Sequence, residues 1–243
     1  MSGATAQAET VEGLFDARFM WRVFFAILAL LVVAGGISLA GRLAGHSIAM
    51  AGHTDDTSFA EVVIGNNVLS APRNMIRFES ARRGGVAERL DLYLRWPDLT
   101  GYTDLARDDF NHADNRRNIL FVSVSEAMMS RDMSGRYAPI YSALTEPTPE
   151  AAPAGLKLRR FTEKSGYVNE TLLVGDRAGN EPFVARCLEG DAAAQSLAPC
   201  ERDIHIAEDL SLSYRFPREL LGDWQKLDAS MLRLAKWILK TAD

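Results

Sequence analysis

An uninterrupted apolar run near the N-terminus is the strongest pattern in the chain. Residues 23–40 read VFFAILALLVVAGGISLA, eighteen positions without a charge. A helix rises about 1.5 Å per residue, so this run nearly crosses the roughly 30 Å hydrocarbon layer of a membrane. A buried core helix of this length seldom lacks a polar face. Ser38-Leu39-Ala40 resembles a signal-peptide cleavage site, but signal cores are only about 7–15 residues long. We therefore predict an uncleaved transmembrane helix over residues 19–42.

The charges that flank this run indicate its orientation. Arg18 and Arg22 precede it, and Arg42 follows it. Because basic residues concentrate on the cytoplasmic side, we expect a cytoplasmic tail over residues 1–18, a linker over 43–60 and an extracytoplasmic domain over 61–243. The Ala- and Arg-rich composition suggests a bacterium, hence a single-pass inner-membrane protein with a periplasmic domain. Gly36 and Ala40 form a small-xxx-small pair, which lets two membrane helices associate into a homo-oligomer.

Beyond the linker the pattern becomes that of β-strands. Residues 89–96 alternate, with Leu90, Leu92, Leu94 and Trp96 on one face, which is typical of a half-buried strand. Residues 118–125 read as a more fully buried strand, residues 61–69 as a strand interrupted at Gly65-Asn66-Asn67, and residues 137–144 as a weaker one. The Pro- and Ala-rich stretch 145–155 is expected to be a loop that divides the domain into halves.

Four further strand candidates follow that loop in close succession. They cover residues 156–162, 167–174, 181–188 and 203–216, the last interrupted near Glu208-Asp209. Strands this close together, joined by short turns, favour antiparallel pairing.

The spacing of apolar residues changes again at the C-terminus. Apolar residues recur there every three or four positions, which predicts an amphipathic helix that starts after Pro217: Leu220, Leu221, Trp224, Leu227, Met231, Leu234, Trp237 and Ile238. A partner surface and a membrane-surface helix are alternatives, but packing onto the sheet explains the stripe most simply. The predicted fold class is a single transmembrane helix plus a mainly-β (α+β) domain, an antiparallel sheet covered by this helix.

The two cysteines, Cys187 and Cys200, flank one small-residue loop between strand candidates. In an oxidising compartment such a pair forms a disulfide. Two free thiols are the alternative, and a redox pair is disfavoured because redox cysteines usually stand two residues apart. The sequence therefore predicts a structural disulfide.

Charge argues against a nucleic-acid partner. The chain carries 27 basic and 32 acidic residues, a formal net charge of -5, and its arginine pairs are scattered. Phosphate binding needs concentrated positive charge. The partners we expect are instead inner-membrane or envelope proteins and, through the N-terminal helix, the lipid bilayer.

Residues 108–115 (DDFNHADN) form the densest polar cluster. Carboxylates beside His112 are able to raise its basicity for general-base work, so Asp109, His112 and Asp114 are the candidate catalytic residues. The simpler interpretation is a solvated loop, since Asp and Asn are common in turns. His46 and His53 with Asp55 and Asp56 offer metal ligands in a linker that is poorly suited to preorganise them. No cofactor motif, metal-ligand spacing or nucleophile motif is present in the sequence.

An aromatic set, Trp96-Pro97, Gly101-Tyr102, Tyr137 and Tyr141, suggests either a glycan- or peptide-binding groove or simple core closure, and we favour the core.

Three functions remain. We rank first a non-enzymatic, membrane-anchored accessory protein of a cell-envelope assembly. An anchored envelope hydrolase with a site at Asp108–Asp114 comes second. A periplasmic ligand sensor that signals through a partner comes third.

Overall fold

The chain divides into two units, an N-terminal one up to Gly52 and a larger one from His53 to Asp243. The computed structural model describes residues 17–49, 52–111, 118–179 and 181–241. The predicted candidates His112 and Asp114 lie outside these residues.

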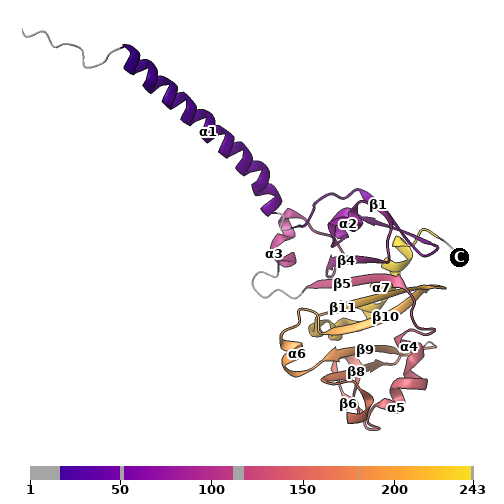
Figure 1. Cartoon of the computed structure of the whole chain (residues 1–243). Coiled ribbons are helices and arrows are strands. Elements are labelled where there is room, and N and C mark those ends of the chain that lie inside the picture. The colour runs from indigo at the N-terminus through magenta and orange to yellow at the C-terminus, as the bar shows by residue number, and fades with distance from the viewer. Residues whose placement is uncertain (1–16, 50–51, 112–117, 180, 242–243) are drawn as a thin grey trace, which may run out of the picture. The chain divides into compact units, whose positions relative to one another are not determined.

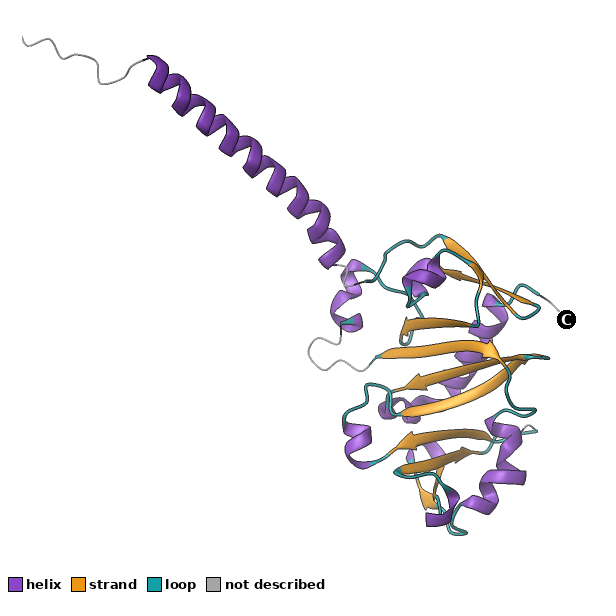
Figure 2. Cartoon of the chain, viewed as in Figure 1, coloured by secondary structure: helices purple, strands orange, loops and turns teal. Residues whose placement is uncertain are grey.

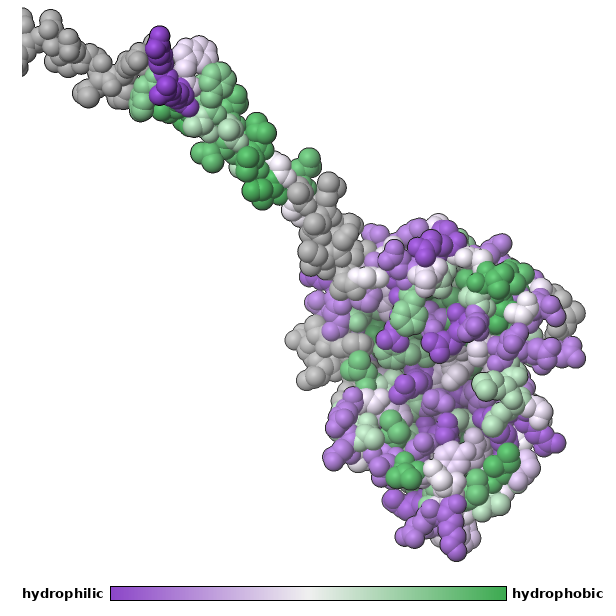
Figure 3. All heavy atoms as spheres, viewed as in Figure 1, coloured by the Kyte–Doolittle hydropathy of each residue, from purple (hydrophilic) through white to green (hydrophobic). Residues whose placement is uncertain are grey.

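The described part of the N-terminal unit, residues 17–49, is one apolar helix, α1 (Ala17–Ala49). Its segment Arg18–Leu39 is long and apolar enough to cross a membrane. Figure 3 shows hydrophobic side chains along the visible side of the helix. The helix continues past the predicted end at residue 42, so part of the expected linker over residues 43–60 is helical.

The larger unit contains two β-sheets and a long C-terminal helix, which confirms an α+β fold (Figures 1 and 2). A three-stranded sheet has the order β2-β1-β3, and an eight-stranded sheet has the order β4-β5-β11-β10-β9-β8-β7-β6. All neighbouring strands of the large sheet are antiparallel, as the short connections predict. The strands are β1 (Phe59–Ile64), β2 (Asn67–Pro72), β3 (Gly85–Val86), β4 (Arg89–Arg95), β5 (Ile119–Glu126), β6 (Glu150–Ala151), β7 (Lys157–Arg160), β8 (Glu170–Gly175), β9 (Phe183–Leu188), β10 (Cys200–Ala207) and β11 (Leu210–Phe216).

Short helical turns connect these strands, and one long helix ends the chain. The helices are α2 (Glu79–Arg82), α3 (Arg107–Phe110), α4 (Met133–Arg136), α5 (Ser142–Leu144), α6 (Gly190–Ala194) and α7 (Trp224–Ile238). The 3₁₀-helical turns are η1 (Arg73–Met75), η2 (Asp104–Ala106), η5 (Pro153–Gly155), η6 (Glu163–Ser165) and η7 (Arg218–Asp223), and η4 (Tyr137–Tyr141) is a π-helical turn.

Two predicted strands proved to be hairpins. The interruption at Gly65-Asn66 is the turn between β1 and β2, and Glu208-Asp209 is the turn between β10 and β11. The weak strand candidate over residues 137–144 is wrong, because these residues form η4 and α5. The stretch 145–155 contains β6, which pairs with β7 at the end of the large sheet, so the sheet continues through it.

Helix α7 packs on one face of the large sheet, as its stripe predicts. Figure 2 shows it passing behind the central strands. Its buried residues share the main core with β1, β2, β4, β5, β10 and β11: Trp224, Leu227, Met231, Leu234, Ala235 and Ile238. The sequence pattern places Trp237 in the same stripe, but its side chain is exposed, with its ring 5.8 Å from that of Phe59.

The other face of the sheet is covered at the β8–β9 end. Met133 of α4 and Tyr141 of η4 form a second core with Leu172, Val174 and Val184. Burial on both faces explains why β8 is buried almost continuously, whereas β5 and β11 alternate.

Candidate binding face

The face of the large sheet that points away from α7 forms the candidate site. On β5, Leu120, Val122 and Val124 are buried in the main core, whereas the intervening Ser123 and Ser125 are half-exposed. On β11, Leu212 and Tyr214 are buried, and Ser211 and Ser213 point the other way. This open face borders two hollows, and Ser213 lines both.

The first, which we call the arginine hollow, has a volume of about 460 Å³. Its floor is formed by β4, β5 and β11, and one wall is formed by the segment Gln195–Ala198. Its charged side chains are Arg77, Arg89, Asp91 and Arg215. Ser123, Ser196 and Ser213 add hydroxyl groups, so the lining is rich in hydrogen-bond donors.

The second, the methionine hollow, has a volume of about 440 Å³ and lies over β10 and β11 beside η4. Met128, Met129 and Ile140 form its apolar rim, and Met128 is 98% exposed. Flexible, exposed methionines are typical of surfaces that bind other proteins.

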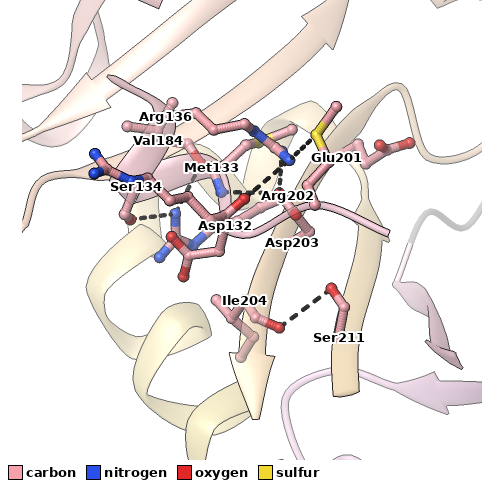
Figure 4. Close-up of polar contacts among 12 residues, drawn as sticks. Asp132, Met133, Ser134, Arg136, Val184, Glu201, Arg202, Asp203, Ile204 and Ser211 are labelled. Atoms are coloured by element: carbon pink, nitrogen blue, oxygen red, sulfur yellow. Dashed lines mark hydrogen bonds and ion pairs between the residues drawn. The ribbon is translucent and has the colours of Figure 1, made fainter. Parts of the chain in front are cut away.

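Ion pairs fix the polar floor of the methionine hollow. Arg136 Nη2 donates to Asp203 Oδ1 at 2.8 Å (Figure 4). Arg136 Nη1 lies 2.8 Å from the sulfur of Met129. Burial raises the pKa of Asp203 above its ordinary value, although Arg136 opposes this effect. Arg186 lies between two carboxylates, 3.2 Å from Glu170 and 3.3 Å from Glu201.

The predicted disulfide between Cys187 and Cys200 is confirmed. The two residues face each other across β9 and β10, with a Cα–Cα distance of 4.0 Å. The loop that they close carries α6 and the segment Gln195–Ala198. The disulfide therefore holds both ends of the loop that forms one wall of the arginine hollow.

A buried polar network supports the face from the α7 side. Asp228 of α7 accepts hydrogen bonds from Arg202 Nε at 2.9 Å, Tyr214 Oη at 3.1 Å and Arg177 Nη1 at 2.9 Å. Arg202 also donates to Ser134 Oγ at 3.0 Å and to the Val184 carbonyl at 2.9 Å. Burial raises the pKa of Tyr214 well above its usual value, so its hydroxyl group stays a donor. The network ties α7 and α4 to the sheet beneath the methionine hollow.

Of the predicted catalytic residues, Asp109 is described and is buried in α3. Its Oδ2 lies 3.6 Å from Arg95 Nη1. Within the described parts of the chain, no three His, Cys, Asp or Glu side chains gather as metal ligands.

The sequence predicts that His53 belongs to the linker, but the residue packs into the larger unit. Its ring stacks on Tyr102 at 4.6 Å and on Tyr93 at 5.2 Å, and its Nδ1 lies 2.8 Å from Tyr93 Oη. Burial raises the pKa of Tyr93 to about 12. The stack fixes the start of the larger unit to β4.

The aromatic set from the sequence does not form one groove. Trp96 belongs to the main core, Tyr102 to the His53 stack and Tyr141 to the second core, all three buried. The core interpretation of these three residues is therefore confirmed, whereas Tyr137 is only partly buried.

Sequence reasoning missed both hollows. The available signal was the alternation in β5 and β11, where serines and Arg215 occupy the face away from the core. The arginines that meet there come from positions as distant as Arg77 and Arg215, so no local motif marks the site.

No protein-family model matches this chain, and no curated protein is detectably similar to it. Two solved structures resemble it. One is Smlt3025 of Stenotrophomonas maltophilia, an immunity protein of the type IV secretion system. The two sequences are 13% identical, the match covers 76% of this chain and 94% of that chain, and the TM-score is 0.50. The other is FrpD of Neisseria meningitidis, an iron-regulated outer membrane lipoprotein. The two sequences are 9% identical, the match covers 78% of this chain and 96% of that chain, and the TM-score is 0.41. The first similarity shows that the fold occurs in a solved protein.

Proposed function

We propose that this chain is a non-enzymatic protein, anchored in the inner membrane by α1, whose larger unit binds another protein on the periplasmic side. The observation that carries the proposal is the open face of the sheet. It offers two adjoining hollows, one rich in arginine and one rimmed by exposed methionine and isoleucine. Protein interfaces combine apolar and polar contacts.

Three further features support the anchor and the compartment. The segment Arg18–Leu39 has the length and composition of a membrane span. Arg18 and Arg22 favour a cytoplasmic N-terminus. The disulfide Cys187–Cys200 fits an oxidising compartment.

The fold is compatible with such a role but does not fix it. Smlt3025 is an immunity protein of a secretion system. A shared fold hosts unrelated functions, so the binding face of this chain carries the argument.

Site-specific photocrosslinking in cells tests the proposal. A photoreactive residue at Ser123 or Ser211 places the crosslinker on the open face, whereas one at Lys236 places it on the exposed side of α7. We expect the same partner protein to be captured from Ser123 and Ser211 and not from Lys236. Equal capture from all three positions, or none from the open face, would refute the assignment.

A C-terminal reporter pair tests the compartment separately. We expect activity from an alkaline-phosphatase fusion, which folds only in an oxidising compartment, and none from a fluorescent reporter restricted to the cytoplasm. The reverse result would place the larger unit in the cytoplasm and refute the orientation.

A further inference from the structure

The arginine hollow has an unbalanced charge. Three guanidinium groups, those of Arg77, Arg89 and Arg215, line it together with one carboxylate, that of Asp91. Asp91 is already engaged, because its Oδ2 accepts from Arg89 Nε at 2.8 Å and its Oδ1 from Ser123 Oγ at 2.9 Å. Two guanidinium groups are left without a carboxylate from this lining.

Arg77 is held by aromatic rings rather than by an acid. Its Cζ lies 5.2 Å from the ring centre of Phe78 and 5.2 Å from that of Phe121. Stacking positions a planar guanidinium group and leaves its N–H edge able to donate hydrogen bonds. Arg77 is therefore oriented without its charge being neutralised by the residues that the structure describes.

Arg215 has a similar environment at the other side of the hollow. Among the described residues, its guanidinium group makes one hydrogen bond, a long contact of 3.5 Å from Nη2 to Ser196 Oγ. Glu201 is its cross-strand neighbour on β10, but that carboxylate pairs with Arg186. Two exposed cations thus face one hollow in a chain whose formal net charge is -5.

The surroundings indicate what kind of anion fits. A small-molecule pocket is usually enclosed and mostly apolar, whereas this hollow is lined by polar groups and adjoins the methionine hollow at Ser213. The methionine hollow is lined by three carboxylates, those of Glu126, Glu201 and Asp203, and by two guanidinium groups, so the excess of positive charge is confined to the arginine hollow. A carboxylate is able to accept two parallel hydrogen bonds from the N–H groups of one guanidinium group.

We propose that the arginine hollow receives carboxylate side chains from an acidic segment of the partner protein. This inference rests on the proposed function, and it specifies the chemistry of the partner at one end of the open face. The methionine hollow then contacts an apolar part of the same partner.

A binding assay on the full chain in lipid nanodiscs tests the inference. The probe is a fluorescent tetra-glutamate peptide capped at both ends, compared with a tetra-lysine peptide. We expect saturable binding of the tetra-glutamate only. Replacing Arg77 and Arg215 by Glu should weaken it about tenfold for each reversed charge. Arg233→Glu, the same change on the exposed side of α7, should leave binding unchanged.

Three results would overturn the inference: no saturable tetra-glutamate binding, equal binding by the double Arg77→Glu/Arg215→Glu protein, or equal binding of tetra-lysine. Displacement of the probe by inorganic phosphate at equal concentration would instead assign a small-anion site and also reject the acidic segment. Should the double Glu protein fail to fold, the double Gln protein serves in its place.

The photocrosslinking at Ser211 keeps this inference separate from the proposed function. If Ser211 still captures a partner while the two arginine changes have no effect on its capture, the binding face stands and the acidic segment is rejected. If Ser211 captures no partner at all, the proposed function itself fails.

Discussion

Removing the carboxylate of Asp228 is the most direct perturbation of the larger unit. Asp228 and Arg202 are both almost fully buried, with side-chain exposures of 5% and 1%, and their Oδ1 and Nε atoms are 2.9 Å apart. In the Asp228→Ala protein, Arg202 keeps its charge but loses the carboxylate that pairs with it, and the Tyr214 hydroxyl group loses its hydrogen-bond acceptor. Breaking a buried pair in this way costs about 3–5 kcal/mol.

Urea denaturation of the full chain in detergent micelles measures this loss. Trp96 and Trp224 are buried in the main core, so their fluorescence reports unfolding of the larger unit. With a urea slope of about 2–3 kcal/mol/M, the midpoint should fall by about 1–2.5 M. Asp176→Ala is the matched control, because Asp176 is 78% exposed and pairs with Lys157. An exposed pair contributes only about 0–1 kcal/mol.

The reasoning would be refuted if Asp228→Ala and Asp176→Ala lowered the midpoint equally. A second protein, Asp228→Leu with Arg202→Met, removes both charges together. We expect it to recover part of the loss, because a buried pair replaced by apolar residues leaves no unpaired ion.

Three further predictions concern other parts of the unit. Replacing Cys187 and Cys200 by Ala should lower the free energy of unfolding by about 3 kcal/mol, measured by the same urea titration; an unchanged midpoint would show that the bridge adds no stability. Gly101→Ala should lower the free energy of unfolding by about 1–3 kcal/mol or more, because the added Cβ would lie 2.5 Å from the Asn74 carbonyl oxygen. Gly222→Ala is the control: its added Cβ meets no atom within 4 Å, so its free energy of unfolding should stay within about 1 kcal/mol of the parent. Because the folded-state pKa of Asp203 is raised above 3.8, its contribution to stability is present below pH 3.8 and is lost as the pH rises through the folded-state pKa. Asp203→Asn should therefore flatten the dependence of unfolding free energy on pH above 3.8, and an unaltered curve would contradict the shift.

Much of the fold follows from burial patterns that are local in sequence. The alternation at residues 89–96 and the apolar run at 118–125 located β4 and β5, because each of these strands buries one face against α7 or the small sheet. The spacing of the C-terminal stripe located α7 in the same way. The cysteines were paired correctly because both flank one loop.

Features that depend on distant partners were missed. Residues 137–144 resemble a strand, yet Tyr141 is buried against β8 and β9 as part of a helical turn. Such a turn is too short to show a helical period. Asp228 and Arg202 are 26 positions apart, and their pairing depends on how α7 lies across β10.

Ser211 and Ser213 lie on the open face and outside both hydrophobic cores. Replacing them should therefore cost little folding free energy, since surface substitutions usually change it by less than about 0.5 kcal/mol. The scaffold and the recognition surface are thus separable on opposite sides of the same strands. Chains built on this scaffold are free to acquire new partners by exchanging outward-facing residues while the inward-facing ones stay fixed.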